Sequence, residues 1–208
     1  MYYYRKYLFI ATVVVTAIGI SLAGCKETGI TTSADAETLG SQTLSSSTKS
    51  PVNIAGQDPQ IVYKQLAALR RATAPFHNIE KAIQADYDTP ITPCWYHSEL
   101  GAMGYHYGNL KYLENGQVDL LKPEALMYEP GSGGNYRLVG MEYIVPVAAW
   151  EGAGNPSLLG QEYHLNEALG LYTLHIWLWR NNPAGLFANW NPNVSCEYAE
   201  ESEDRAGI

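Results

Sequence analysis

The chain has 208 residues, of which 46% are hydrophobic and 16% are charged. This composition is too apolar for an intrinsically disordered chain, and the length suits one packed domain. The formal net charge of -8 provides no basic surface to displace counterions from phosphates, so we expect no nucleic-acid partner.

The first 24 residues have the features of an export signal. Arg5 and Lys6 precede an apolar run without charge from residue 8 to residue 22. The run leads into Leu22-Ala23-Gly24-Cys25, which resembles the lipobox of bacterial lipoproteins, where the signal is cut before the cysteine and the thiol receives a diacylglycerol. We therefore expect residues 1–24 to be a lipoprotein signal peptide. The alternative is an uncleaved membrane anchor, because the run approaches the length that spans a bilayer.

The lipobox resemblance implies lipidation of Cys25 and a protein anchored outside the cytoplasm in the cell envelope. The membrane is then a partner through the acyl chains alone, since the mature chain is acidic and has no polybasic patch. Lys26 after the cysteine is compatible with the outer membrane if the cell is Gram-negative. Residues 25–57 are rich in Ser, Thr, Gly and Ala and show no hydrophobic period, which predicts a flexible tether.

Two helices are predicted at the start of the globular part, residues 58–196. Asp58 followed by Pro59 is a typical helix start, and apolar residues at helical spacing continue to about residue 71. Pro75 interrupts this pattern. A second apolar stripe predicts a helix over residues 76–87.

Strand-like segments follow the helices. Residues 103–107, 136–147 and 171–180 are rich in aromatic and branched side chains and are bounded by Gly, Pro and Asn. Helices followed by strands predict an α+β domain, in which the N-terminal helices pack on an antiparallel sheet or small β-barrel. Residues 197–208 carry five acidic side chains and predict a solvated acidic tail.

The cysteines separate into one lipidation site and one pair. With Cys25 assigned to lipid, Cys94 and Cys196 form an even pair in an oxidising compartment, which favours a disulfide. Thiolate ligation of a metal is the alternative, although neither cysteine has a ligating partner at short spacing.

Alternation along the predicted strands places polar residues among apolar ones. On residues 171–180, His175 shares a face with Trp177 and Trp179 and is opposite the apolar core face. On residues 136–147, Glu142 shares a face with Leu138, Gly140 and Ile144, and such a carboxylate is costly to bury unless it is paired. His106 shares a face with Gly104, which predicts space for an approaching group.

These positions suggest one candidate site. His106, Glu142 and His175 come from different strands and could converge, with His97 completing the set. Two imidazoles and a carboxylate suit a divalent transition metal such as Fe, Zn or Cu. No compact metal motif supports this hypothesis. The alternatives are a hydrogen-bonded polar group in a Tyr-rich core and a general acid/base pair, so the sequence does not decide whether the protein is an enzyme.

Aromatic residues suggest a second class of function. Several lie near glycine-rich loops, where platforms for sugars or other small molecules are usually built. The candidate ligand-binding residues are Trp95, Tyr105, Tyr107, Trp177 and Trp190. The alternative hypothesis is therefore a non-enzymatic ligand-binding or envelope interaction module with a small-molecule or saccharide ligand; core packing explains the same residues equally well.

A set of motifs between about residues 73 and 196 resembles an uncharacterised family of secreted bacterial proteins. The motifs are Met103-Gly104-Tyr105-His106-Tyr107, Leu138-Val139-Gly140-Met141-Glu142-Tyr143, Leu174-His175-Ile176-Trp177-Leu178-Trp179, and Asn182-Pro183-Ala184-Gly185 through Asn191-Pro192-Asn193-Val194-Ser195-Cys196. The resemblance implies secretion and a single domain, and it implies no activity.

Overall fold

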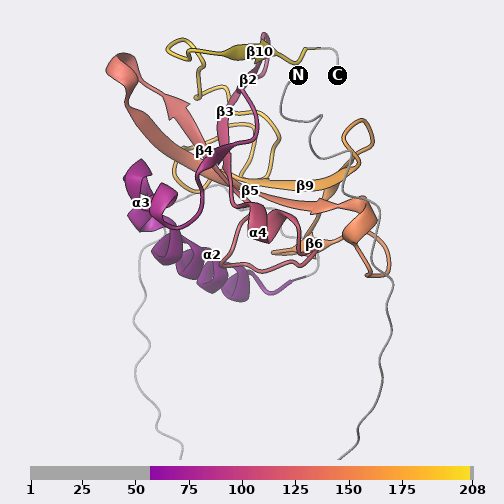
Figure 1. Cartoon of the computed structure of the whole chain (residues 1–208). Coiled ribbons are helices and arrows are strands. Elements are labelled where there is room, and N and C mark those ends of the chain that lie inside the picture. The colour runs from indigo at the N-terminus through magenta and orange to yellow at the C-terminus, as the bar shows by residue number, and fades with distance from the viewer. Residues whose placement is uncertain (1–56, 207–208) are drawn as a thin grey trace, which may run out of the picture. The chain divides into compact units, whose positions relative to one another are not determined.

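Figure 1 shows the fold of the computed structural model, which describes residues 57–206. The expected signal peptide, Cys25 and nearly all of the expected tether lie outside these residues. Within residues 57–206, no helix is both long enough and apolar enough to cross a membrane.

The first helix begins where the sequence predicts it. Helix α2 (Pro59–Thr73) is capped by Asp58, whose carboxylate accepts the N–H of Gln60 at 2.8 Å. The predicted second helix is instead two short ones, η1 (Ala74–His77) and α3 (Ile79–Gln84). Asn78 separates them, because its backbone is extended and its side chain caps α3 by accepting the N–H of Glu80.

The rest of the described chain is dominated by one curved sheet (Figure 1). Its strands are β1 (Thr89–Pro90), β2 (Cys94–His97), β3 (Gly101–Gly108), β4 (Ala125–Pro130), β5 (Tyr136–Pro146), β8 (His164–Asn166), β9 (Leu171–Ile176) and β10 (Ser202–Asp204). The order is β10-β2-β3-β4-β5-β9-β8, with β1 paired to β3, and every pair is antiparallel except β10 with β2. The remaining elements are α4 (Leu110–Leu113), η2 (Ser132–Gly134), η3 (Val147–Ala149) and the hairpin of β6 (Ser157–Leu158) and β7 (Gln161–Glu162). The predicted α+β class is confirmed.

Each face of the sheet packs against a different part of the chain. One face forms the larger core with α2 and α3, which contribute Val62, Leu66, Leu69 and Ala82. The opposite face forms a smaller cluster of Ala102, Met127, Val139, Trp177 and Val194. We call these the helix side and the loop side of the sheet. Strands β3, β4, β5 and β9 contribute buried residues to both sides, so a polar residue on either side is removed from water.

A β-bulge changes the face assignment that strict alternation predicts for β5. Met127 pairs with Gly140 and Tyr128 with Leu138, so Val139 is left without a partner on β4. As a result Leu138 lies in the helix-side core and Val139 in the loop-side cluster. The prediction that Leu138 shares a face with Glu142 is wrong, because the extra residue reverses the alternation at this point.

The predicted strand 171–180 is shorter in the structure. Strand β9 ends at Ile176, and the chain then turns, with the N–H of Leu178 bonded to the carbonyl of Ile176. Trp179 therefore packs on the helix side, where its Nε1 donates to Thr73 Oγ1 at 3.2 Å. The prediction that it shares a face with His175 is wrong for the same reason.

The C-terminal segment is attached to the sheet in two ways. The predicted disulfide between Cys94 and Cys196 is confirmed and joins residues 102 positions apart in the chain. Within the acidic segment, Ser202–Asp204 are exposed and form β10, which pairs in parallel with β2 (Figure 1).

Gly104 is needed for close contact between β3 and β4. Its φ is +84°, and a Cβ there would collide with the backbone of Tyr128. The predicted space beside this glycine is therefore filled by a neighbouring strand rather than by a ligand.

Gly104→Ala is expected to destabilise the fold by about 2 to 5 kcal/mol, because left-handed strain and steric overlap add together. Gly134→Ala is a matched control, since Gly134 has φ +77° and no atom within 4 Å of the added methyl group. The control should lower the free energy of unfolding by only about 1 to 2 kcal/mol, the strain of a left-handed alanine. Urea unfolding of both variants measures the difference, and equal losses would contradict the close strand contact.

Candidate metal centre

Three strands carry the candidate ligands to one place. Glu142 on β5 pairs directly with His175 on β9. His106 on β3 pairs with Met127 on β4, which pairs in turn with Gly140, two residues before Glu142. Since paired residues point to the same face and alternate residues share a face, all three side chains lie on the loop side of the sheet.

The three side chains are close together and almost fully buried. Glu142 Oε2 lies 3.4 Å from His106 Nε2, and Glu142 Oε1 lies 3.3 Å from His175 Nε2. One donor atom from each residue lies within 4.8 Å of the other two. His106, Glu142 and His175 are 0%, 7% and 3% exposed. The prediction that these residues converge is therefore confirmed.

Neither Nε2 atom has a hydrogen-bond partner among residues 57–206. The contacts to Glu142 are longer than the 2.7 to 3.2 Å of ordinary N–H···O bonds. A buried imidazole nitrogen without a partner is destabilising, and native proteins rarely leave one unsatisfied. A group that bonds to both Nε2 atoms would satisfy them.

Thr92 fixes the orientation of His106. Its Oγ1 accepts the backbone N–H of His106 at 3.3 Å and lies 2.8 Å from the Nδ1 of the same residue. In the tautomer that donates from Nδ1 to Oγ1, the Nε2 lone pair faces Glu142 and is available to a cation. Hydrogen bonds of this kind orient the histidine ligands of metal sites.

Burial shifts the protonation of all three groups toward the neutral form. It lowers the pKa of His106 to about 3, with a further contribution from His175. It also lowers the pKa of His175 to about 4, although the side chain of Asn189 acts in the opposite direction. Burial raises the pKa of Glu142 to about 8. Both imidazoles are therefore uncharged at neutral pH, which is the form that binds metal ions, whereas Glu142 would have to release its proton to bind one.

Two tryptophans line the group. The ring of Trp95 lies 5.8 Å from that of His106, and the ring of Trp177 lies parallel to that of His175 at 6.3 Å. Trp177 is held by a hydrogen bond from its Nε1 to the carbonyl of Ala188 at 2.6 Å. These two predicted ligand-binding residues thus form the walls of the polar group.

The other predicted aromatic residues lie elsewhere. Tyr105 and Tyr107 contact Tyr136, and Tyr107 packs against the helix-side core. Trp190 packs against His97 with ring centres 5.6 Å apart. The structure therefore does not bring the five predicted residues into one binding surface.

His97 is not part of the His106–Glu142–His175 group. It pairs with Gly101, at the opposite end of β3 from His106, whereas Trp95 takes the position beside His106. The Nδ1 of His97 accepts the N–H of Glu99 at 3.1 Å. The prediction of His97 as a fourth ligand fails because the bulge between Trp95 and Tyr96 and the length of β2 carry it away.

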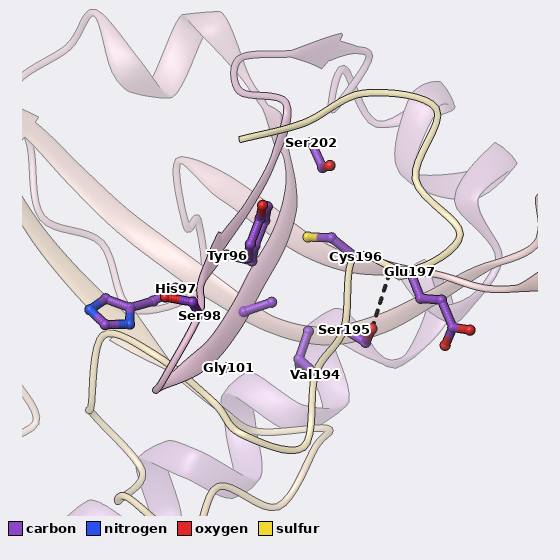
Figure 2. Close-up of a pocket in the computed structure, with 10 residues that line it drawn as sticks. Tyr96, His97, Ser98, Gly101, Val194, Ser195, Cys196, Glu197 and Ser202 are labelled. Atoms are coloured by element: carbon purple, nitrogen blue, oxygen red, sulfur yellow. Dashed lines mark hydrogen bonds between the residues drawn. The ribbon is translucent and has the colours of Figure 1, made fainter. Parts of the chain in front are cut away.

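His97 instead borders an open pocket of about 500 Å³ beside the disulfide. In Figure 2, Tyr96 and Cys196 lie on facing sides of this pocket, and the His97 ring points away from them. Ser98, Ser195 and Ser202 contribute hydroxyl groups to the lining. The pocket is separate from the three buried ligands, none of which lines it.

Sequence reasoning missed two residues around the group, Thr92 and Asn189. Thr92 contacts His106 across 14 positions of chain, and Asn189 comes from the loop after β9. No period or motif connects either residue to its histidine. The only sequence signal near Thr92 is that Pro93 and the disulfide-bonded Cys94 follow it and restrict the backbone there.

Comparison of the chain with protein-family models, with curated proteins and with solved structures finds no match.

Glu142→Gln is expected to change how the stability of the metal-free protein depends on pH. Because the pKa of Glu142 rises from 4.5 to about 8 on folding, the folded state binds this proton more tightly than the unfolded chain. This contribution to stability is complete below pH 4.5 and is lost as the pH rises to about 8, by up to about 1.4 kcal/mol per pH unit. The glutamine variant lacks it.

Urea unfolding in the presence of a chelator, repeated between pH 4.5 and 8, measures the two slopes. Burial also raises the pKa of Glu124 to about 8, and the charge of Glu142 contributes to that shift, so a Glu124→Gln background isolates the effect of Glu142. Identical slopes would contradict a buried, protonated Glu142.

Proposed function

We propose that this protein binds a divalent transition-metal ion through His106, Glu142 and His175. The observation that carries the proposal is the convergence of three buried donors in which both Nε2 atoms lack a hydrogen-bond partner. An ion bonded to all three would supply that partner.

The donor spacing agrees with ligation. Two metal bonds of about 2.1 Å at a tetrahedral angle place their donor atoms roughly 3.4 Å apart. The nitrogen–oxygen distances from Glu142 are 3.4 Å through Oε2 and 3.3 Å through Oε1, so an ion at this spacing would bind both carboxylate oxygens. A metal-free polar group would require hydrogen bonds at these positions, and the distances are too long for good ones.

The donor types restrict the metal. Calcium and magnesium prefer oxygen ligands, whereas two imidazoles and one carboxylate suit iron, zinc or copper. Three protein ligands leave one position for water or another small ligand. We propose ion binding without a specific reaction, because the Glu142 side chain is only 9% exposed and none of the three residues lines the pocket beside the disulfide.

Metal analysis tests the proposal. Protein purified without chelator is expected to retain close to one transition-metal ion per chain, measured by mass spectrometry of the elements. The double variant His106→Ala/His175→Ala should bind Zn²⁺ more than about 100-fold more weakly, because it loses direct ligands and not only their hydrogen-bond partners. The double variant His97→Ala/His164→Ala is the control and should retain the ion, since neither residue belongs to the group.

Failure of the wild-type protein to bind Zn²⁺, Fe²⁺ or Cu²⁺ would overturn the proposal. It would favour the alternative, a non-enzymatic ligand-binding or envelope interaction module.

We also propose that the protein is lipid-anchored in the cell envelope through Cys25. The Leu22-Ala23-Gly24-Cys25 motif after an apolar run supports this location, and the Cys94–Cys196 disulfide is compatible with an oxidising compartment.

Cys25→Ser is expected to abolish incorporation of radiolabelled palmitate and to prevent maturation at this site. Labelling of cells that express the wild-type and variant proteins, followed by fractionation, checks this. Equal membrane association of both proteins without label in either would indicate an uncleaved anchor.

A further inference from the structure

We infer that strand β10 controls exchange at the metal site by holding Trp95 over His106. The inference rests on the proposed metal-binding function. It adds the route by which the ion enters and leaves, and the contacts that keep that route closed. Trp95 is the cover, and Glu203 and Arg205 are the latch.

Trp95 covers the His106 side of the group. It pairs with Gly104, which lies two residues before His106 on β3 and therefore on the same face. From that position the indole reaches His106, where the ring centres are 5.8 Å apart. Trp95 is half-buried while His106 is fully buried, so of these two neighbouring rings only the indole is in contact with solvent.

The C-terminal segment holds Trp95 through several contacts. Glu203 is the β10 partner of Trp95, and its Oε2 accepts the indole N–H at 3.1 Å. The guanidinium of Arg205 lies over the indole, 4.6 Å from the ring centre, and donates to Glu203 Oε1 at 3.1 Å. The backbone N–H of Arg205 also bonds to the carbonyl of Tyr96 at 2.8 Å. The indole is thus fixed by hydrogen bonding at its edge and by a cation at its face.

Strand β10 can detach without disrupting the core. All three of its residues are exposed, and it pairs only with β2. The disulfide at Cys196 and the hydrogen bond from the N–H of Cys94 to the carbonyl of Glu201 hold the chain just before it. Release of residues 202–206 would therefore free Trp95 while the preceding loop stays in place.

Trp177, on the other side of the polar group, cannot be released in the same way. Trp177 is 3% exposed, belongs to the loop-side cluster and is bonded through its backbone and its indole to Leu186 and Ala188. Of the two tryptophan sides, exchange through the Trp95 side consequently breaks fewer buried contacts.

A latch that contributes no ligand and is equally strong in the metal-free and metal-bound protein changes the rates of exchange and leaves the affinity unchanged. The test uses the full chain with Zn²⁺ as the probe and compares wild type with Glu203→Gln/Arg205→Ala. Stopped-flow mixing with a chromophoric chelator gives the dissociation rate, and mixing the metal-free protein with Zn²⁺ gives the association rate. We expect both rates to rise about tenfold, which corresponds to weakening the latch by about 1.4 kcal/mol, with an unchanged Kd.

Two further variants make the test specific. Arg137→Ala removes a different exposed arginine, which pairs with Glu129 at 3.4 Å, and should leave both rates unchanged. In a Trp95→Ala background the cover is absent, so adding the latch substitutions should have no additional effect. A further increase in that background would overturn the inference, because the latch would then act through something other than Trp95.

Labelling of His106 by diethyl pyrocarbonate provides a readout that needs no metal. The latch variant should label His106 faster than the wild type, with His97 as an internal reference. If the labelling rate of His106 and the Zn²⁺ exchange rates are both unchanged, the inference about the latch is wrong and the metal-binding proposal is unaffected. Faster labelling in a protein that binds no Zn²⁺ would retain the Trp95 cover and overturn the metal-binding function.

Discussion

The burial of three ionisable side chains on one face of the sheet is the constraint on which this structure depends. Taking His106, Glu142 and His175 out of water disfavours their charged forms, as the directions of their pKa shifts show. A chain tolerates such a group only when something compensates for the lost solvation. Thr92 supplies one hydrogen bond to this group, whereas His106 Nε2 and both ring nitrogens of His175 have no hydrogen-bond partner among residues 57–206.

The two faces of the sheet carry different kinds of residues: the helix side carries most of the apolar core, and the loop side carries the buried polar group. The helix side has most of the large apolar residues and the tyrosines whose hydroxyls bond to backbone carbonyls, such as Tyr128 and Tyr143. The loop side has a smaller apolar cluster, which leaves room for polar residues between strands. Central strands therefore position the three side chains, while Trp177 after β9 and Trp95 on β2 lie beside them.

The sequence was sufficient to predict the fold class, the start of α2, the disulfide and the convergence of His106, Glu142 and His175. These features depend on local capping, on cysteine number or on side-chain alternation within one strand. Alternation failed at Val139 and Trp179, where a bulge and a turn interrupt the period. It also gave no information on which residues approach from other strands, so Gly104 was interpreted as open space and His97 as a ligand.

The pairing of β10 with β2 was beyond sequence reasoning for a different reason. Ser202–Asp204 are polar and exposed, so they have no apolar period, and their partner strand is about a hundred positions earlier in the chain. Thr92 was missed because a single hydroxyl in a turn has no pattern at all. In each case the decisive contact is between segments far apart in the sequence, and only the folded chain shows it.

The acidic character of β10 has a consequence for how these molecules meet one another. An outer strand of a sheet presents unpaired backbone groups that can join a second sheet, and charged side chains there oppose such joining. Asp204 places negative charge along this rim beside the Glu203–Arg205 ion pair, and the strand is only three residues long. Copies crowded together at high local density would repel one another at this rim rather than extend their sheets into an aggregate.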